Sequence, residues 1–324
     1  VLARRLLALL VVELAAYAWL AVALLARGWH PLAVLALVAF LHFVALRASV
    51  VLLGFAIAAV VGERPLPHLG GSARARLVLR ECRAFWLNYA LVPFEPWLAP
   101  EPPVERVVLV HGILCNRAVW RGFKRRLARH GVRAHAVTLE PVLGDIDAMA
   151  DDLARQLRSA REPVVVVAHS LGGLVTRRLL QRHPDAPVRG VVTIATPHAG
   201  SVQAALAFGQ AGRSLRRTSA WLRALAEGAA PPVPRVALYS WHDELVSPPG
   251  SCRWEGAHEC PYAGIGHIDL LWSDAVAATV ACEIEAMVAA GSEAPGAVGA
   301  PGASATPAVA NAHPPRTAAT DTPR

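Results

Sequence analysis

The sequence has 324 residues, 54% of them hydrophobic, and a formal net charge of +8 at pH 7. This length allows one sizeable domain with appendages, and the apolar content exceeds that of an average soluble protein, so we expect part of the chain to lie in a bilayer. Five cysteines are too few, and odd in number, for a disulfide scaffold. The excess of basic residues accompanies no recognisable nucleic-acid-binding module, so we expect no nucleic-acid partner.

The start of the chain predicts a membrane anchor. Residues 6–26 are almost unbroken Leu, Ala and Val, long enough as a helix to cross roughly 30 Å of hydrocarbon. A second apolar stretch at residues 31–61 follows a short link. We interpret residues 1–62 as a transmembrane helical hairpin, with a third helix if the second stretch crosses twice. The alternative for the first run is a cleaved signal peptide, because Arg4 and Arg5 precede it.

The two apolar stretches of the predicted hairpin, residues 6–26 and 31–61, carry one charged residue each, Glu13 and Arg47, which the hairpin geometry places at similar depth. Charged groups inside a membrane are costly and usually paired. An ion pair between these two residues is therefore one interpretation. The other is an arginine whose long side chain reaches the membrane surface.

The side of the membrane on which the rest of the chain lies stays open. Basic residues follow the hairpin, which suits an anionic lipid surface and, by the positive-inside rule, a cytoplasmic domain. These residues are Arg64, Arg74, Arg76, Arg80 and Arg83. In contrast, Cys252 and Cys260 are close enough in sequence to close a small loop, and a disulfide between them would require an oxidising compartment.

The remaining chain predicts a linker, one α/β domain and a tail. Residues 63–103 read as a basic helix, at residues 77–91, and an extended Pro-rich linker, at residues 93–103. Between residues 104 and 290, short β-branched runs alternate with amphipathic segments, which is typical of a parallel sheet with crossover helices. We predict strands at residues 107–110, 132–139, 164–168, 188–195 and 233–240, and helices at residues 119–130, 148–160, 171–183 and 273–290. Residues 291–324 are poor in large apolar residues, so we expect a disordered tail.

Ser170 carries the strongest chemical signal. It stands between the four-valine strand that begins at Val164 and the helix that begins at Leu171. A sharp strand-to-helix turn of this kind lifts the serine hydroxyl above a sheet and needs small residues two positions before and two positions after the serine. Ala168 and Gly172 occupy those positions. The usual first residue is glycine, and alanine adds only a methyl group, so we predict that Ser170 is a nucleophile.

A serine nucleophile needs donors for the oxyanion that forms on attack. His111 and Gly112 end the first predicted strand, and Gly112 permits a close backbone approach. We predict an oxyanion hole from the backbone N–H groups of Ile113 and Leu171, with His111, Gly112, His169 and Gly172 supporting the site. An ordinary strand-ending turn is the alternative for the His-Gly pair.

The general base is expected late in the chain, because serine hydrolases built on such a sheet follow the order serine, acid, histidine. His267 lies on a glycine-rich loop just before the final helix, which leaves its side chain free to reach the serine. We predict that His267 is the base. The alternative is His258, which we place in the loop between Cys252 and Cys260.

The acid that orients the base is expected directly after the strand at residues 233–240. Asp243 follows that strand and precedes a turn through Val246 and Pro248. We predict that Asp243 holds the histidine, with Glu244 as the alternative. A helix with two histidines or a paired CxxC motif is missing from the sequence, so we expect no metal and no cofactor, although Asp269 and Asp274 could join a calcium site.

Taken together, these segments resemble the bacterial triacylglycerol lipases and related esterases of the α/β-hydrolase superfamily. The resemblance covers residues 107–290, and its matching segments are residues 110–113, 168–173, 196–201 and 266–267, with Asp243, Val246 and Pro248. It implies an α/β-hydrolase fold, a mostly parallel sheet flanked by helices, here preceded by the hairpin. It also implies carboxylester hydrolysis through an acyl-enzyme on Ser170, with residues 196–198 shaping the edge of the site in a structural role.

The hairpin is not part of the small secreted lipases, so a membrane-anchored enzyme in the bacterial inner membrane, acting on lipid or other esters, fits the sequence better. Residues 201–232 occupy the position of a cap and predict either a lipid-contacting lid or an ordinary surface helix. An acyltransferase or thioesterase on the same residues is the alternative, followed by a membrane protein that only binds partners. The sequence leaves the acyl-chain preference and the oligomeric state open.

Overall fold

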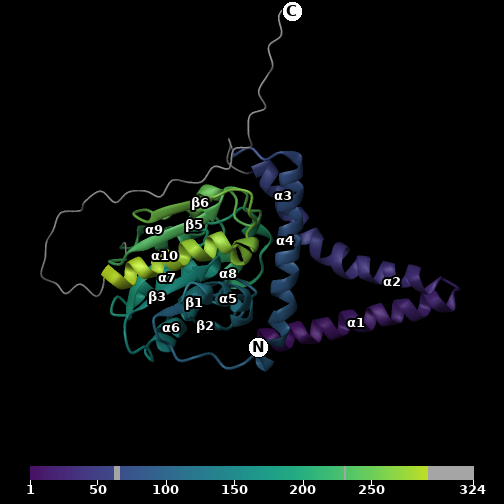
Figure 1. Cartoon of the computed structure of the whole chain (residues 1–324), viewed down its shortest axis with the longest axis horizontal. Helices are drawn as coiled ribbons and strands as arrows, with labels where there is room; N and C mark the ends of the chain where they lie inside the picture. The colour runs from purple at the N-terminus through teal and green to yellow at the C-terminus, as the bar shows by residue number, and fades with distance from the viewer. Residues whose placement is uncertain (62–65, 230, 291–324) are drawn as a thin grey trace, which may run out of the picture. The chain divides into compact units, whose positions relative to one another are not determined.

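The computed structural model describes residues 1–61, 66–229 and 231–290 (Figure 1). The predicted tail at residues 291–324 lies outside the described residues, and so does the predicted end of the hairpin at residue 62. Contacts join the described residues into one compact unit.

A six-stranded sheet in the order β2-β1-β3-β4-β5-β6 organises the second part of the chain (Figure 1). Every pair of neighbouring strands in this sheet is parallel, which confirms the predicted fold class. The strands are β1 (Val107–Val110), β2 (His135–Val137), β3 (Val164–His169), β4 (Val188–Ile194), β5 (Arg235–Ser240) and β6 (His258–Tyr262). Because the strands are parallel, their carboxyl ends lie at one edge of the sheet, which is where ligands bind in such folds.

Helices cover both faces of the sheet, so its central strands are buried on both sides and consist largely of valine. Val107 and Leu109 face a core that also contains residues of α5 and α10, whereas Val108 and Val110 face a core built with α6 and α7. These helices are α5 (Arg121–Arg129), α6 (Ile146–Leu157), α7 (Leu171–Arg182) and α10 (Asp274–Ala290). Each of them lies within three residues of its predicted bounds.

One strand was not predicted. The segment around His258 was interpreted as a loop, but it forms the edge strand β6, which pairs with β5 from His258 opposite Val236 to Tyr262 opposite Ser240. Its sequence, His-Glu-Cys-Pro-Tyr, has no apolar run because an edge strand lies largely in solvent. Pro261 is tolerated there, since a proline lacks the N–H that an interior strand needs.

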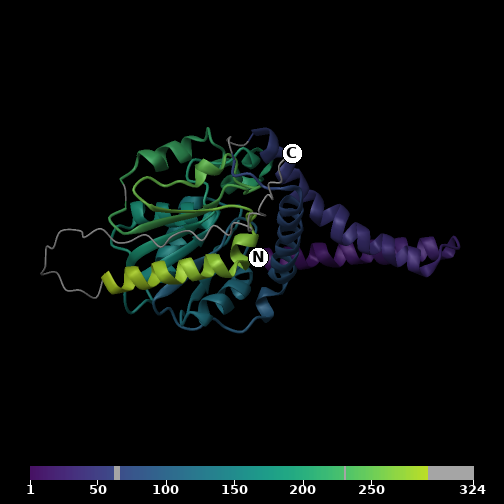
Figure 2. The same ribbon diagram turned by 45° about the horizontal axis from the view of Figure 1, so that its top comes forward.

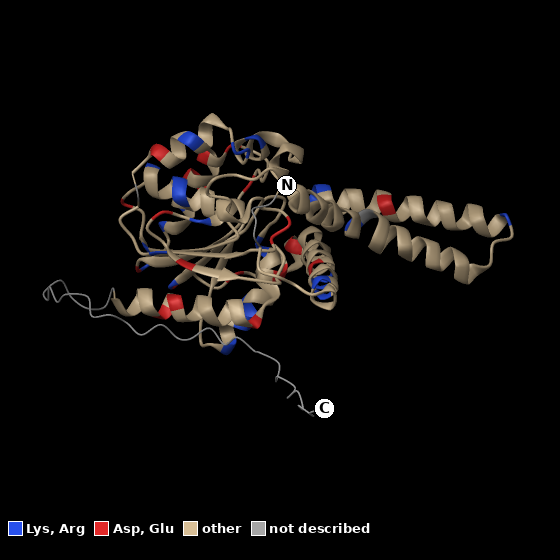
Figure 3. Ribbon diagram, turned by 90° about the horizontal axis from the view of Figure 1, so that it is seen from above, with Lys and Arg blue, Asp and Glu red and all other residues tan. Residues whose placement is uncertain are grey.

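The apolar start of the chain forms α1 (Leu2–Ala26), followed by α2 (Pro31–Phe40), the π-helix η1 (Leu41–Ala48) and α3 (Ser49–Val61). Among the described residues, Leu2–Ala26 and the continuous segment Pro31–Val61 are long and apolar enough to cross a membrane. The helices α1 and α2 contact one another and lie side by side in both views (Figures 1 and 2). Charged residues are sparse along them (Figure 3).

Of the two interpretations of Glu13 and Arg47, the structure shows the ion pair. The Arg47 guanidinium donates to both carboxylate oxygens of Glu13, over 2.9 and 3.0 Å. Tyr17 donates to the same carboxylate, and His42 lies 2.9 Å from it. Arg47 belongs to η1, where the wider π-helical turn replaces the α-helical hydrogen-bond pattern.

The segment between hairpin and sheet is packed against the domain. The basic helix is α4 (Gly71–Leu91), which begins six residues before its predicted start. The interpretation of residues 93–103 as an extended linker is wrong at its beginning, because Val92–Trp97 forms the 3-10 helix η2. Its Val92 carbonyl accepts a hydrogen bond from Asn116 over 2.9 Å, and its Glu95 carboxylate accepts one from Thr138 over 2.6 Å. These contacts fix the start of the domain to the helix that precedes it.

Candidate active site

Ser170 stands at the sharp turn between β3 and α7. Its backbone adopts φ 54° and ψ −123°, a strained conformation for a residue other than glycine and the one that a nucleophile elbow requires. A side chain at Gly172 would place its Cβ 2.5 Å from the Val110 carbonyl oxygen, so only glycine fits the close approach of α7 to β1. Ala168 is fully buried, so the packing around the turn accommodates the methyl group that a glycine would lack.

His267 and Asp243, the predicted base and acid, are joined by a buried hydrogen bond. Nδ1 of His267 donates to Oδ2 of Asp243 over 2.8 Å. The other carboxylate oxygen of Asp243 accepts the backbone N–H groups of Leu245 and Val246, over 2.8 and 2.7 Å. These two bonds fix the carboxylate so that Oδ2 faces the imidazole ring. The other ring nitrogen of His267, Nε2, has no hydrogen bond to the other described residues.

Neither alternative residue takes the place of His267 or Asp243. Glu244 reaches the backbone N–H of His267, 3.0 Å away, and not its ring. His258 lies at the beginning of β6, opposite the start of β5. That edge of the sheet is the one away from Ser170 and Asp243, which follow the carboxyl ends of β3 and β5.

The pKa of His267 is raised above its ordinary value. Burial opposes the charged imidazolium, but the negative charge of Asp243, its hydrogen bond and the charge of Glu81 together outweigh burial. A histidine in this setting holds a proton more firmly than a free imidazole, which suits a residue that must accept a proton from a serine and later return it.

His169 connects the serine turn to the histidine loop. Its Nε2 donates to the backbone carbonyl of His267 over 3.3 Å, and the two rings lie 4.7 Å apart between centroids. Burial lowers the pKa of His169 well below the usual range, so its ring is neutral. Among the described residues, no hydrogen bond joins the Ser170 hydroxyl to His267; such bonds commonly tighten only when substrate binds.

The turn after β1 is held against Ser170. A Cβ at Gly112 would lie 3.0 Å from the Cβ of Ser170. His111 donates from Nδ1 to the Gly112 carbonyl over 2.8 Å and accepts from the Leu139 backbone N–H at Nε2 over 3.0 Å. Burial lowers the pKa of His111 to about 4, which keeps this neutral donor and acceptor pattern at physiological pH. Leu171 is the first residue of α7, so its backbone N–H has no acceptor within the helix.

The segment around His198 packs behind the serine turn. The His198 ring stacks on Trp254 with centroids 4.7 Å apart, and its Nε2 lies 3.3 Å from the Thr193 hydroxyl. A Cβ at Gly173 would collide with the Thr196 side chain. These contacts indicate that Thr196 and His198 pack the core beside the serine turn.

Glu81 is a site neighbour that the sequence interpretation missed. It belongs to α4, is fully buried, and accepts the backbone N–H groups of Ile268 and Asp269, both over 2.9 Å. The signal that could have identified it is helical spacing, because Leu77, Glu81, Ala84 and Asn88 form the buried face of α4.

A cavity of about 840 Å³ lies between α3, α4 and the loop after β5. Phe55 and Leu77 contribute apolar walls, and Trp241, Asp243 and Ser247 line it from the domain. The cavity therefore borders the acid and not the serine turn.

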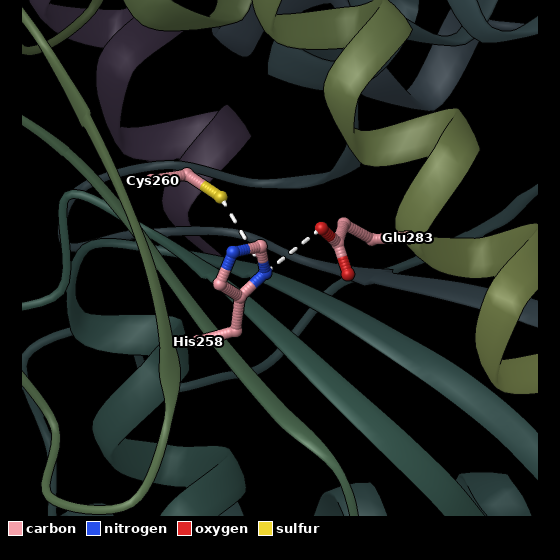
Figure 4. Close-up of side chains that lie close together, drawn as sticks. All are labelled: His258, Cys260 and Glu283. Atoms are coloured by element: carbon pink, nitrogen blue, oxygen red, sulfur yellow. Dashed lines mark hydrogen bonds and ion pairs between the residues drawn. The ribbon is translucent and has the colours of Figure 1, made fainter. Parts of the chain in front are cut away.

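Three side chains of β6 and α10 lie close enough together to hold a metal ion (Figure 4). His258 Nδ1 lies 3.0 Å from a Glu283 oxygen and 3.9 Å from the Cys260 sulfur. Cys260 and Cys252 are both free thiols, so the disulfide considered for them is not formed. The two acids considered for a calcium site each pair with arginine instead: Asp269 with Arg80, over 3.0 Å, and Asp274 with Arg126, over 3.1 Å.

Comparison with known proteins identifies the class. Residues 107–320 match the alpha/beta hydrolase family, and the chain belongs to that family. Over 111 residues it is 35% identical to the pimeloyl-[acyl-carrier protein] methyl ester esterase of Photorhabdus laumondii, covering 32% of this chain and 40% of that protein.

The fold is similar to the crystal structure of Aspergillus fumigatus lipase B, with a TM-score of 0.52 and 20% identity over 56% of this chain and 52% of that chain. The chain thus spans about half of lipase B and less of the esterase. The likeness to lipase B therefore concerns the fold.

Proposed function

We propose that the protein is a membrane-anchored serine carboxylester hydrolase that acts on lipid esters through an acyl-enzyme on Ser170. The observation that carries this proposal is the buried hydrogen bond between His267 and Asp243, together with the contact of the His267 loop with His169 of the serine turn. In this chain the serine, the acid and the histidine also follow one another in the order typical of the family.

The proposed reaction has two halves. Nε2 of His267 removes the proton of the Ser170 hydroxyl while the serine oxygen attacks the ester carbonyl carbon, and the backbone N–H groups of Ile113 and Leu171 stabilise the oxyanion. Collapse of this intermediate breaks the ester bond, and His267 returns the proton to the leaving alcohol. Water then attacks the acyl-serine by the same route, releasing a carboxylic acid and restoring the serine. Asp243 holds the ring and stabilises the imidazolium in both halves.

Membrane anchoring is supported by the apolar surface of the hairpin. Trp19, Val22, Leu32 and Leu35 are all more than 60% exposed, a pattern that suits contact with lipid and not with water. In this proposal residues 1–62 anchor the domain, which faces lipid esters at the bilayer surface.

The proposed cap at residues 201–232 is also suited to lipid contact. It comprises η4 (Gln203–Leu206), α8 (Gly209–Ser214) and α9 (Ala220–Glu227). Leu206 and Phe208 are 57% and 81% exposed, and Gln203 donates to the Glu244 carbonyl over 2.9 Å. Leu206 and Phe208 therefore lie exposed on a segment that is bonded to the loop of Asp243, where they are suited to contact an acyl chain.

Transfer of the acyl group to another acceptor, or cleavage of a thioester, would use the same acyl-enzyme. The partial likeness to an esterase that acts on an acyl-carrier-protein methyl ester favours oxygen esters and hydrolysis. Adding an alcohol to the assay separates the alternatives, because a transferase partitions the acyl group to the alcohol faster than to water.

The decisive experiment compares the full chain in detergent with Ser170→Ala and with Ser159→Ala, a control at an exposed serine. Hydrolysis is measured with p-nitrophenyl esters from acetate to palmitate, alongside labelling by a fluorophosphonate probe. We expect Ser170→Ala to lose both activity and labelling, the control to keep both, and the rate to rise with acyl-chain length. Equal activity in Ser170→Ala and the unsubstituted protein would remove Ser170 from the mechanism.

A further inference from the structure

We propose that Glu81 and Glu244 form a buried acid pair that positions the loop carrying His267, so that helix α4 belongs to the catalytic machinery. This inference rests on the proposed function, since it assigns a role relative to the general base. It goes beyond the family, because α4 (Gly71–Leu91) lies before the residues that match the alpha/beta hydrolase family. Both residues act through the loop and are therefore positioning residues.

The acid pair binds three consecutive backbone N–H groups of the loop. Oε2 of Glu244 accepts that of His267 over 3.0 Å. Oε1 of Glu81 accepts that of Ile268, and Oε2 accepts that of Asp269, each over 2.9 Å. These donors lie at and just before the start of the 3-10 helix η6 (Asp269–Trp272), where backbone N–H groups have no acceptor within the helix, so the two carboxyl groups satisfy them.

The fit around Glu81 is tight. A Cβ at Gly266 would lie 2.2 Å from Oε2 of Glu81, so the loop can approach the carboxyl group only because a glycine precedes His267. On the outer side, Arg80 pairs with Asp269 over 3.0 Å. Two neighbouring residues of α4 therefore hold the loop directly after the predicted base.

Glu244 is enclosed from the other side by the apolar segment. A Cβ at Gly54 of α3 would lie 3.0 Å from the Glu244 carbonyl oxygen and 3.1 Å from its Cγ. Glu81 and Glu244 are both completely buried. Gly54 of α3 thus contacts the loop that carries Asp243, and Glu81 of α4 contacts the loop that carries His267. Both helices precede the residues that match the family.

Two buried carboxyl groups in contact retain a proton between them. Burial is the main cause that raises the pKa of both groups; the charge of Glu244 adds to the effect on Glu81, and the charge of Asp243 adds to the effect on Glu244, whose pKa rises to about 8. Oε1 of Glu244 has no donor from the other described residues, and a proton shared with Glu81 satisfies it. The shared proton allows both side chains to remain buried without two uncompensated charges.

A glutamine at position 244 reproduces this arrangement. Its carbonyl oxygen can accept the His267 N–H, and its amide can donate to the Glu81 carboxylate. A leucine at either position has similar volume but leaves the loop N–H groups without acceptors. A misplacement of the base by about 1 Å is enough to lower the rate about 10²-fold.

The test compares Glu81→Leu, Glu244→Leu and Glu244→Gln in the full chain in detergent, with kcat and KM measured on a soluble short-chain ester. Asn88→Leu is the matched control, because Asn88 is buried on the same face of α4 but accepts from the Trp272 side chain, over 3.0 Å, and not from a backbone N–H group of the His267 loop. We expect both Glu-to-Leu variants to lose about 10²-fold in kcat with little change in KM. Glu244→Gln is expected to keep most of the rate, and Asn88→Leu to lower Tm without lowering kcat.

Four outcomes decide the matter. A folded Glu81→Leu with unchanged kcat overturns the inference, and so does a Glu244→Gln that is as slow as Glu244→Leu. If Glu81→Leu does not fold, Glu81→Gln replaces it; it keeps one acceptor oxygen, and full kcat in that variant would also overturn the inference. A Ser170→Ala variant that remains active would instead refute the proposed function on which the inference rests.

Discussion

Asp243→Asn provides the sharpest test of the proposed mechanism, because it replaces one carboxylate oxygen by an amide NH2 group and removes the negative charge, with almost no change in side-chain shape. The asparagine carbonyl oxygen can still accept the backbone N–H groups of Leu245 and Val246. Its amide must then face Nδ1 of His267, which forces the ring proton onto Nε2. A ring with a proton on Nε2 cannot accept the Ser170 proton, so we expect kcat to fall on the order of 10⁴-fold, as in serine proteases with this change.

The pH dependence must change as well. Burial lowers the pKa of His267, and the charge and hydrogen bond of Asp243 are the main causes that raise it above the ordinary value. In the unsubstituted protein, kcat/KM is therefore lost as pH falls through a value above the ordinary imidazole pKa. Without the Asp243 charge, burial prevails, and the acid limb of the residual activity moves to lower pH.

The assay is the pH profile of kcat/KM for a soluble p-nitrophenyl ester, corrected with the rate of Ser170→Ala. Glu244→Gln is the matched control, since it changes the adjacent acid but keeps an acceptor for the His267 backbone N–H. A plateau that stays within ten-fold of the unsubstituted protein, or an acid limb that does not move, would refute the assignment of Asp243.

Two further predictions concern the serine turn and the hairpin. Gly172→Ala should prevent correct folding or abolish activity, because its Cβ would lie 2.5 Å from a carbonyl oxygen, whereas Gly71→Ala, which meets nothing within 4 Å, should be neutral in Tm and kcat. Arg47→Leu should lower Tm in detergent, because it leaves the Glu13 carboxylate without its bidentate partner. The double replacement with Glu13→Leu should restore the Tm; if it only adds a second loss, the two residues do not act as a pair.

The candidate site depends on residues that local sequence patterns already mark. Ser170 was recognisable because a valine strand, small flanking residues and a helix are all local in sequence. Chain order then selected His267 and Asp243, and the structure brings these two together over 2.8 Å. The parallel sheet followed from the alternation of β-branched and amphipathic segments. Edge strand β6 escaped notice because it lies largely in solvent and has no apolar pattern.

The partners of the histidine loop could only be found in the tertiary structure. Glu81 and Ile268 are 187 positions apart, and no local pattern relates a carboxyl group on a basic helix to a backbone N–H in a distant loop. Periodicity reports which face of α4 is buried, but not which donors meet it there. Hydrophobic periodicity and turn chemistry are local properties, so the sequence by itself predicted most of the elements and the proposed reactive residues. Close packing is a property of the whole molecule, and it alone decided that two buried acids bind the backbone of the loop that carries the proposed base.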